Sequence, residues 1–352
     1  MTIHPGAIDL PIVDLARFAA AGAERDAFLA DLRRILHDHG FFYLSGHGVP
    51  PELIADTLAL SKRFFALPEA DKLEIEMINS PHFRGYTRVG REYTRGARDW
   101  REQIDVNTEG KAVEIGPDTP AWKRLLGPNQ WPSALPELKP TLLAYQAEVT
   151  RVGISVLKAI SAALGQDENA FADVWTPLPT QLLKIIRYPG RDVAETSQGV
   201  GPHKDGGLVT VLLQDVVEGL RVRTEDGVWL EARPIPGTFV VNTGELLELA
   251  TDGFVRADVH DVIAPPPGVE RFSVAFFLGA RLDSTVPVLD LPEELRTETR
   301  GVTADPLNPL FREVGRNHLK SRFRSHPDVA ERHHADLLTP EELAATGPGS
   351  AY

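Results

Sequence analysis

The feature that most constrains the fold is a series of seven short apolar segments in the second half of the chain. Each is rich in β-branched or aromatic residues, and Gly, Pro, Asp or Asn separates it from the next, a pattern typical of strands joined by short turns. No helical stretch between them is long enough to connect parallel strands. We therefore predict an antiparallel sandwich or barrel. The segments are residues 182–188, 208–214, 220–223, 228–231, 238–242, 254–263 and 272–278.

Helices are predicted on both sides of this strand-rich region. Helical spacing of apolar residues indicates a helix over residues 28–36 that stops at Gly40, one from Pro51 to about Pro68, and a longer one over 138–160. A short strand, 41–44, follows the first helix. Helices return at 310–323, and the Thr-Pro-x-Glu pattern at 339–342 fits the start of a last short helix. We expect one domain over 1–352, with a mostly helical region at 1–165, a strand core at 180–280, and helices and a tail at 281–352.

The composition excludes several classes of protein. The chain has no cysteine, so disulfides, thiolate nucleophiles, Fe–S clusters and zinc fingers are ruled out, and any metal must bind to His, Asp or Glu. A net charge of -13 opposes binding to nucleic acid. No apolar run is long enough for a membrane span and no secretory signal is visible, so we expect a cytoplasmic protein. Oligomeric state has no signal in the sequence.

The segment Gly-Pro-His-Lys-Asp-Gly-Gly at 201–207 carries the strongest chemical signal. It lies where a strand should begin, and residues i and i+2 of a strand share a face, so His203 and Asp205 would converge. His260, in the predicted strand 254–263, could return beside them. Two histidines and a carboxylate with open positions form the ligand set of non-haem Fe(II) oxygenases. A zinc hydrolase could use the same set, and a lone histidine is more often a hydrogen-bonded core residue.

A second pair of polar residues lies close behind. Arg271 and Ser273 share a face of the last predicted strand and offer a guanidinium and a hydroxyl to a carboxylate. An anion-binding pair next to a metal suits a cosubstrate that chelates iron at one end and has a carboxylate at the other. A zinc hydrolase would have no obvious use for this arginine.

Taken together, these motifs resemble the isopenicillin N synthase-like Fe(II)/2-oxoglutarate-dependent dioxygenases. The resemblance rests on HKDGGLVTVLLQD (203–215), GLRV (219–222), VVNTGELLELATDG (240–253), the His260 segment, RFS (271–273) and SGHGVP (45–50). It implies a mainly β protein with flanking helices, in which N- and C-terminal helices wrap a double-stranded β-helix, or jelly-roll.

The resemblance also implies a set of site residues. His203, Asp205 and His260 would bind iron, and Arg271, Ser273 and Tyr188 would hold the far carboxylate of 2-oxoglutarate. The sequence departs from the family at two places: Ile186 stands where many relatives have Asn, and Asp261 follows His260 where Arg is common. Neither change removes an iron ligand.

The implied activity is the hydroxylation of a small molecule, with desaturation or cyclisation as variants. Fe(II), 2-oxoglutarate and O2 would take part through a ferryl intermediate, and succinate and CO2 would be released. Two alternatives remain open at this stage: an iron oxidase of the same fold that needs no 2-oxoglutarate, and a non-catalytic jelly-roll that binds a metal or small ligand.

Candidate substrate contacts lie in the arginine-rich stretch 84–101, which in the resembling family borders the substrate pocket. Its glycines indicate a hairpin or loop. We expect one or two of its arginines, such as Arg84, to contact substrate together with Tyr86, Glu92 or Tyr93. A solvated surface paired to nearby acids is the alternative. Of the neighbours Phe276 and Phe277, one should face the core and the other the cavity, and Phe277 is included among the candidates.

Other polar residues are expected to have structural roles and no part in catalysis. Turn chemistry explains Asn242 and Glu245 better than catalysis does. The C-terminal histidines are expected on a solvated helix face. These are His318, His326, His333 and His334.

Overall fold

Two facing antiparallel sheets form the core of the computed structural model, which describes residues 10–193, 195–302 and 308–338. Successive strands mostly alternate between the sheets, which confirms the predicted jelly-roll. The large sheet contains β7 (Thr180–Tyr188), β9 (Val209–Gln214), β12 (Phe239–Thr243) and β14 (Arg271–Gly279). The small sheet contains β8 (Gln198–His203), β10 (Leu220–Arg223), β11 (Trp229–Glu231) and β13 (His260–Ile263).

Strands from the first half of the chain extend the large sheet on both sides. On one side β2 (Phe41–Ser45) pairs with β12, and β1 (Ile12–Asp14) lies outside it. On the other, β6 (Glu102–Asn107) pairs with β7, and β3 (Gly85–Thr87) is the outer strand. The complete order in the described sheet is β1-β2-β12-β9-β14-β7-β6-β3. The region 1–165 therefore supplies strands as well as helices.

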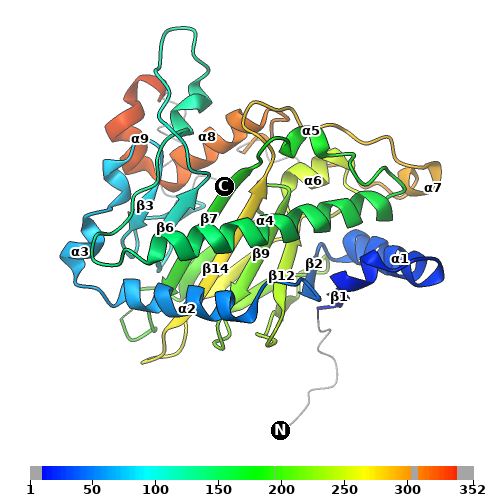
Figure 1. Ribbon diagram of the computed structural model, residues 1–352, viewed down its shortest axis with the longest axis horizontal. Coiled ribbons are helices and arrows are strands. Elements are labelled where there is room, and N and C mark those ends of the chain that lie inside the picture. The colour runs from blue at the N-terminus through cyan, green and yellow to red at the C-terminus, as the bar shows by residue number, and fades with distance from the viewer. Residues whose placement is uncertain (1–9, 194, 303–307, 339–352) are drawn as a thin grey trace.

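Helices cover the outer face of the large sheet. The long α4 (Leu138–Ala163) runs across it with α2 (Pro51–Phe65) alongside, and α1 (Ala23–Asp38) lies near β1 and β2 (Figure 1). Gly40 ends α1 with a φ of 58°, and a Cβ there would come within 2.3 Å of the Arg256 carbonyl oxygen, so only glycine fits. These three helices match the prediction.

Shorter helices connect the remaining parts. The C-terminal pair, α8 (Val314–Ser325) and α9 (Pro327–His334), lies together at one end of the large sheet, near β3 and β6 (Figure 1). The shorter helices are α3 (Glu69–Leu73), α5 (Ala172–Trp175), α6 (Glu245–Ala250), α7 (Glu293–Arg296), α8 (Val314–Ser325) and α9 (Pro327–His334), with 3-10 turns at Leu15–Ala19, Met77–Asn79, Ala121–Leu125 and Ala335–Leu337. A hairpin, β4 (Tyr93–Thr94) and β5 (Ala97–Arg98), occupies the arginine-rich stretch as predicted.

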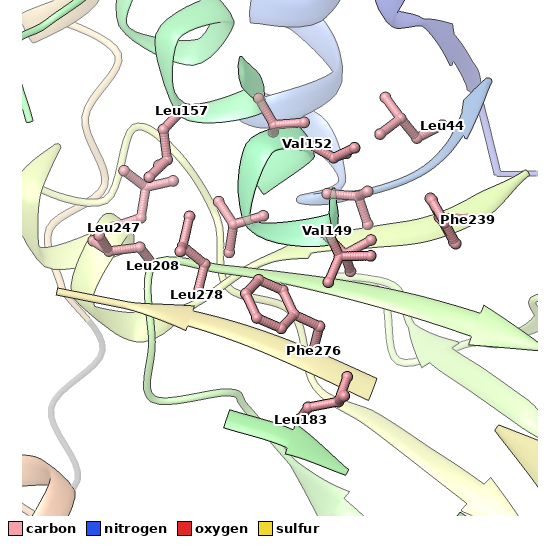
Figure 2. Close-up of a cluster of buried hydrophobic side chains, with 14 of the residues drawn as sticks. Leu44, Val149, Val152, Leu157, Leu183, Leu208, Phe239, Leu247, Phe276 and Leu278 are labelled. Carbon is pink, nitrogen blue, oxygen red and sulfur yellow. The ribbon is translucent and has the colours of Figure 1, made fainter. Parts of the chain in front are cut away.

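The main hydrophobic core lies between α4 and the large sheet. Figure 2 shows Val149, Val152 and Leu157 of α4 packed against Phe276 and Leu278 of β14. Alternate residues of β14 point the other way, toward the small sheet. The inner space between the two sheets has its own smaller apolar cluster. The large sheet thus separates a packed core from the interior in which the polar motifs lie.

Two details of the prediction need correction. Residues 254–259 are not strand, and His260 is the first residue of β13 rather than an interior one. The Gly-Pro-His segment ends a strand, β8, instead of beginning one. The last predicted helix, at Thr339 to Glu342, lies outside the described residues. Within the described residues, no helix is long and apolar enough to cross a membrane.

Candidate active site

The two predicted histidines face each other across the small sheet. Antiparallel pairing of β8 and β13 places His203 directly opposite His260. Asp205 lies in the loop just after β8, and its Oδ1 is 3.5 Å from His203 Nε2 and 3.7 Å from His260 Nε2. One ligand atom from each residue lies within 4.8 Å of the others. The three side chains therefore converge on one point, although Asp205 reaches it from a loop and not from a strand.

Backbone carbonyls fix the orientation of both imidazoles. His203 Nδ1 lies 2.8 Å from the Gly201 carbonyl oxygen, and His260 Nδ1 lies 3.3 Å from that of Asp258. A neutral imidazole that donates from Nδ1 presents a lone pair on Nε2, the nitrogen that faces Asp205 in both residues. This arrangement prepares both Nε2 atoms to bind a metal.

Two neighbours hold the carboxylate of Asp205. Its Oδ2 accepts hydrogen bonds from Thr210 Oγ1 at 2.5 Å and from Asn242 Nδ2 at 2.8 Å, which leaves Oδ1 toward the histidines. The interpretation of Asn242 as a turn residue was therefore wrong. Its role follows from the register of the strands, in which Asn242 on β12 pairs with Thr210 on β9, and the local sequence does not show that register.

The pKa values of Asp205 and His260 favour an ionised carboxylate and a neutral imidazole, the forms that bind a divalent cation. Burial opposes ionisation of Asp205, but the two histidines and the Asn242 hydrogen bond hold its pKa well below the usual range. Burial, together with the adjacent His203, lowers the pKa of His260 to about 4. Burial also disfavours the charged form of His203, yet Asp205 raises its pKa. A metal ion would compete with that proton, because a ligating imidazole must be neutral.

A buried arginine lies on the inner face of β14. Arg271 is 0% exposed, and its Nε and Nη2 donate to the Val217 carbonyl oxygen at 3.2 Å and to Gln214 Oε1 at 2.8 Å. Its Nη1 and the Oγ of Ser273 are buried without a hydrogen-bond partner. No salt bridge joins Arg271 to a described carboxylate. A buried guanidinium with only neutral partners is costly, so these atoms fit a carboxylate supplied by a ligand.

Tyr188 lies beside Arg271, and we refer to Arg271, Ser273 and Tyr188 together as the cradle. Strand pairing places it opposite Arg271, whose guanidinium carbon lies 5.0 Å from the centre of the tyrosine ring. Its hydroxyl also contacts Arg101. A Cβ on Gly199 of β8 would come within 2.9 Å of the same ring, so glycine is needed there to seat the tyrosine.

The two departures from the family pattern are accommodated. Ile186 lies opposite Ser273 in the strand register, is 2% exposed and belongs to the apolar cluster between the sheets. Asp261 lies opposite Arg221, and their side chains form a salt bridge with an Nη2–Oδ2 distance of 2.5 Å. Neither residue disturbs the triad or the cradle.

A cavity of about 180 Å³ opens beside the triad. His203, Asp205, Glu92 and Phe277 all line it, whereas Phe276 is in the main core, so Phe277 is the phenylalanine that faces the cavity. The remaining walls come mainly from β4, β7 and α8. Their lining residues include Tyr93, Leu182, Lys184, Glu245, Lys320 and Arg324.

Two of the expected substrate contacts lie elsewhere. Arg84 donates to the carbonyl oxygens of Thr108 and Leu125 and lines a separate cavity of about 400 Å³. Tyr86 is buried in the main core, where its hydroxyl donates to Glu102. Neither residue lines the cavity beside the triad; from the arginine-rich stretch, Glu92, Tyr93, Thr94 and Arg101 do.

The interpretation of the C-terminal histidines as a solvated face was also wrong for most of them. His326 and His334 are each 1% exposed, His333 contacts the Ile78 carbonyl oxygen through Nε2 at 2.8 Å, and His318 lines both cavities. Burial lowers the pKa of His318 to about 3. These helices are therefore packed against the protein through their histidines.

Two imidazoles and one carboxylate that converge inside a jelly-roll, beside a buried arginine without a carboxylate partner, are typical of a mononuclear non-haem iron oxygenase. Comparison with known families agrees. Residues 10–134 match the N-terminal domain described as "non-haem dioxygenase in morphine synthesis", and residues 179–280 match the 2OG-Fe(II) oxygenase superfamily.

Individual relatives point the same way. The chain is 39% identical to the 2-oxoglutarate-dependent dioxygenase frbJ of Dothideomycetidae sp. (strain 11243), with 92% of this chain and 91% of that one covered. It is 35% identical to a homoarginine-6-hydroxylase of Arabidopsis thaliana over 81% of each chain. The crystal structure of a full-length Neurospora crassa protein in complex with alpha-KG superposes with a TM-score of 0.70 at 26% identity and covers 84% of this chain and 93% of that one.

The chain belongs to the isopenicillin N synthase-like Fe(II)/2-oxoglutarate oxygenases. It is an Fe(II)- and 2-oxoglutarate-dependent dioxygenase, with O2 as co-substrate. The predicted family, fold, enzyme class and cofactors are confirmed. The alternatives of a 2-oxoglutarate-independent oxidase and of a non-catalytic jelly-roll find no support among these relatives.

Proposed function

We propose that His203, Asp205 and His260 hold the Fe(II), that Arg271, Ser273 and Tyr188 bind the distal carboxylate of 2-oxoglutarate, and that the cavity beside them holds a small substrate that is hydroxylated. In the balanced reaction, one oxygen atom of O2 enters a C–H bond and the other enters succinate as 2-oxoglutarate loses CO2. Bound Fe(II) supplies the redox chemistry that couples these two events. The protein supplies ligation, orientation and exclusion of water.

The observation that carries this assignment is the pair of buried donors without partners on β14. Arg271 Nη1 and Ser273 Oγ project from alternate residues of one strand into the interior between the sheets. A carboxylate placed there would accept from both, and Tyr188 lies opposite on β7. The guanidinium is already held at Nε and Nη2, so the cradle needs little reorganisation to bind an anion.

The surroundings of the cradle favour a dry site. Ile186, Val200, Val222 and Val262 belong to the apolar cluster between the sheets. Such walls strengthen the attraction between Arg271 and a carboxylate, because the local dielectric is low. They also limit water near the metal, which protects a reactive oxidant from side reactions.

Hydroxylation of a small molecule agrees with the names of the relatives. These include the homoarginine-6-hydroxylases of plants and, at 36% identity over 80% of each chain, the validamycin A dioxygenase of Streptomyces hygroscopicus subsp. limoneus. A cavity of about 180 Å³ accommodates a compact polar molecule.

The test is binding and turnover of 2-oxoglutarate. We expect Arg271→Gln to weaken 2-oxoglutarate binding about 10- to 100-fold, because a charge-assisted contact is lost, while Fe(II) affinity is retained. Arg281→Gln, which removes an arginine that pairs with Asp283 away from the triad, is the matched control. Binding is followed by the charge-transfer absorption of the anaerobic Fe(II) complex and turnover by succinate release. Wild-type rates of succinate release in His203→Ala and Asp205→Ala would contradict the assignment.

A further inference from the structure

We propose that Glu245 binds a positively charged group of the substrate, which places the substrate among organic cations such as amines and guanidines. The inference rests on the proposed function and specifies which molecules the cavity accepts. Its basis is the set of carboxylates that line the cavity and the partners that each already has.

Three carboxylates line the cavity: Asp205, Glu92 and Glu245. Asp205 belongs to the triad. Both carboxylate oxygens of Glu92 already have cationic partners: Oε1 accepts from Lys184 Nζ at 2.6 Å, and Oε2 accepts from Arg101 Nη2 at 2.7 Å. Glu245 is the remaining one, and within the described part of the chain no hydrogen bond or salt bridge engages its carboxylate.

The backbone holds Glu245 next to the triad. It is the first residue of α6, and its N–H donates to the Asp205 carbonyl oxygen at 2.7 Å. Its Oε2 would lie 3.9 Å from a Cβ on Gly206, the residue after Asp205. The carboxylate therefore lies in van der Waals range of the loop that carries the metal ligand, and Glu245 lines the cavity there.

The nearest lysines have other partners. Lys204 Nζ pairs with Glu248 Oε2 at 2.9 Å, one turn further along α6, and Lys320 Nζ donates to the Pro309 carbonyl oxygen at 2.6 Å. Among the described residues, neither lysine forms a hydrogen bond or a salt bridge with the Glu245 carboxylate. A partly buried carboxylate without a direct partner gains most from a ligand that brings both a charge and hydrogen-bond donors.

A cation at Glu245 would also orient the substrate. The carboxylate lies on the same side of the cavity as the Asp205 loop, and Phe277 contributes an aromatic ring to the cavity wall. Anchoring the charged end at Glu245 leaves the adjacent carbon chain beside the triad, where a C–H bond is to be attacked. Glu245 is thus a specificity-determining residue in this proposal, with no role in iron or 2-oxoglutarate binding.

The experiment compares pairs of amino acids that share the α-ammonium and α-carboxylate groups, one with a cationic side chain (the cation) and one with an uncharged side chain (the neutral ligand). L-homoarginine and L-homocitrulline are nearly isosteric, and L-lysine and its Nε-acetyl form make a second pair. Each is titrated anaerobically by calorimetry into enzyme loaded with Fe(II) and 2-oxoglutarate. We expect at least one cation to bind more tightly than its neutral counterpart, and Glu245→Gln to weaken that cation about 10- to 100-fold without weakening the neutral ligand.

Glu248→Gln is the matched control, since it removes the same charge one turn along α6 from a carboxylate that Lys204 already engages. We expect it to change cation binding less than about 3-fold. An equal loss of cation affinity in the Glu245→Gln and Glu248→Gln variants would overturn the proposal. So would the finding that no cation binds more tightly than its neutral counterpart. The Fe(II)–2-oxoglutarate absorption is recorded in every titration, so failure of the proposed function shows separately as loss of that absorption.

Discussion

At the scale of single residues, the partners of Asp205 matter as much as the three metal ligands. Thr210 and Asn242 both donate to Oδ2, so Oδ1 alone is presented to the metal position. Partners that orient a ligand commonly contribute 10- to 100-fold to metal affinity. Thr210 and Asn242 are therefore positioning residues for the iron site.

We expect Thr210→Val to lower Fe(II) affinity about 10-fold, because the variant keeps the shape of the side chain and removes its donor. Thr210→Ser keeps the hydroxyl and should restore the affinity. Fe(II) titration of the apo protein measures the effect directly, and thermal unfolding of the apo forms checks that the fold is intact. Equal affinities for Val and Ser would show that the hydroxyl does not position Asp205.

Sequence reasoning located the residues with conspicuous chemistry and missed those that support them. His203, Asp205 and His260 form a recognisable pattern, and the structure brings them together. The role of Asn242 depends on the register of β12 against β9, which local patterning does not encode. Arg84 was proposed as a substrate contact because of its charge, whereas its side chain in the structure donates to backbone carbonyl oxygens.

At the scale of secondary-structure elements, the two faces of β14 have different roles: one packs in the hydrophobic core and the other faces the site. Phe276 is 0% exposed in the core under α4, whereas Phe277 lines the cavity beside the triad. Arg271 and Ser273 lie on the same face as Phe277. One face of the strand thus contributes to stability and the other to the site.

Alanine at these two neighbours should therefore have different effects. Phe276→Ala leaves a cavity in the core and should lower the free energy of unfolding by about 3 to 5 kcal/mol. Phe277→Ala should cost clearly less stability, and its main effect should be a higher KM for the substrate. Urea denaturation of both variants measures the first effect and steady-state kinetics the second. Similar losses of stability would contradict this division.

The elements that were predicted have strong local signals, and the missed ones do not. α1, α2 and α4 follow from apolar periodicity, and the strands of the large jelly-roll sheet follow from apolar runs. β8 contains two glycines and a proline, and β6 (Glu102–Asn107) is largely polar although every residue in it is buried. Both strands exist because of their neighbours: β8 pairs with β13, and β6 lies between β3 and β7.

At the scale of the whole molecule, a network of buried charges joins strands of the large sheet and the β4 segment to the C-terminal helix α8 beside the site. Glu92 pairs with Lys184 and Arg101, and Arg322 of α8 pairs with Asp105 of β6 at 2.7 Å. His326, at the end of α8, lies 3.6 Å from Glu92. The C-terminal helices are thus attached to the cavity wall through ionic contacts as well as apolar ones.

His326 should make stability depend on pH. Burial lowers its pKa in the folded protein to about 4 from an ordinary value of 6.5. Between these values the unfolded chain binds a proton that the folded protein excludes, so the contribution is present above pH 6.5 and is lost as the pH falls toward 4. From this residue alone, stability should be on the order of 2 kcal/mol lower at pH 5 than at pH 7.

Urea denaturation at pH 7 and pH 5 tests this expectation. His326→Gln cannot titrate, so its stability should fall less between the two pH values than that of the wild type. Other buried histidines, such as His318, remain in the variant and leave some dependence on pH. Identical pH dependence in the two proteins would exclude His326 as a source.

The extension of the large sheet by β2 and β6 has a consequence for how enzymes of this architecture can be recombined. The catalytic strands do not form a unit that can be transferred alone. A fragment limited to residues 180–280 would leave β12 and β7 with unpaired edges, and unpaired strand edges promote aggregation. A chimera that exchanges the first half of the chain to alter specificity must therefore transplant two strands that fit the recipient's sheet, along with the loops that meet the substrate.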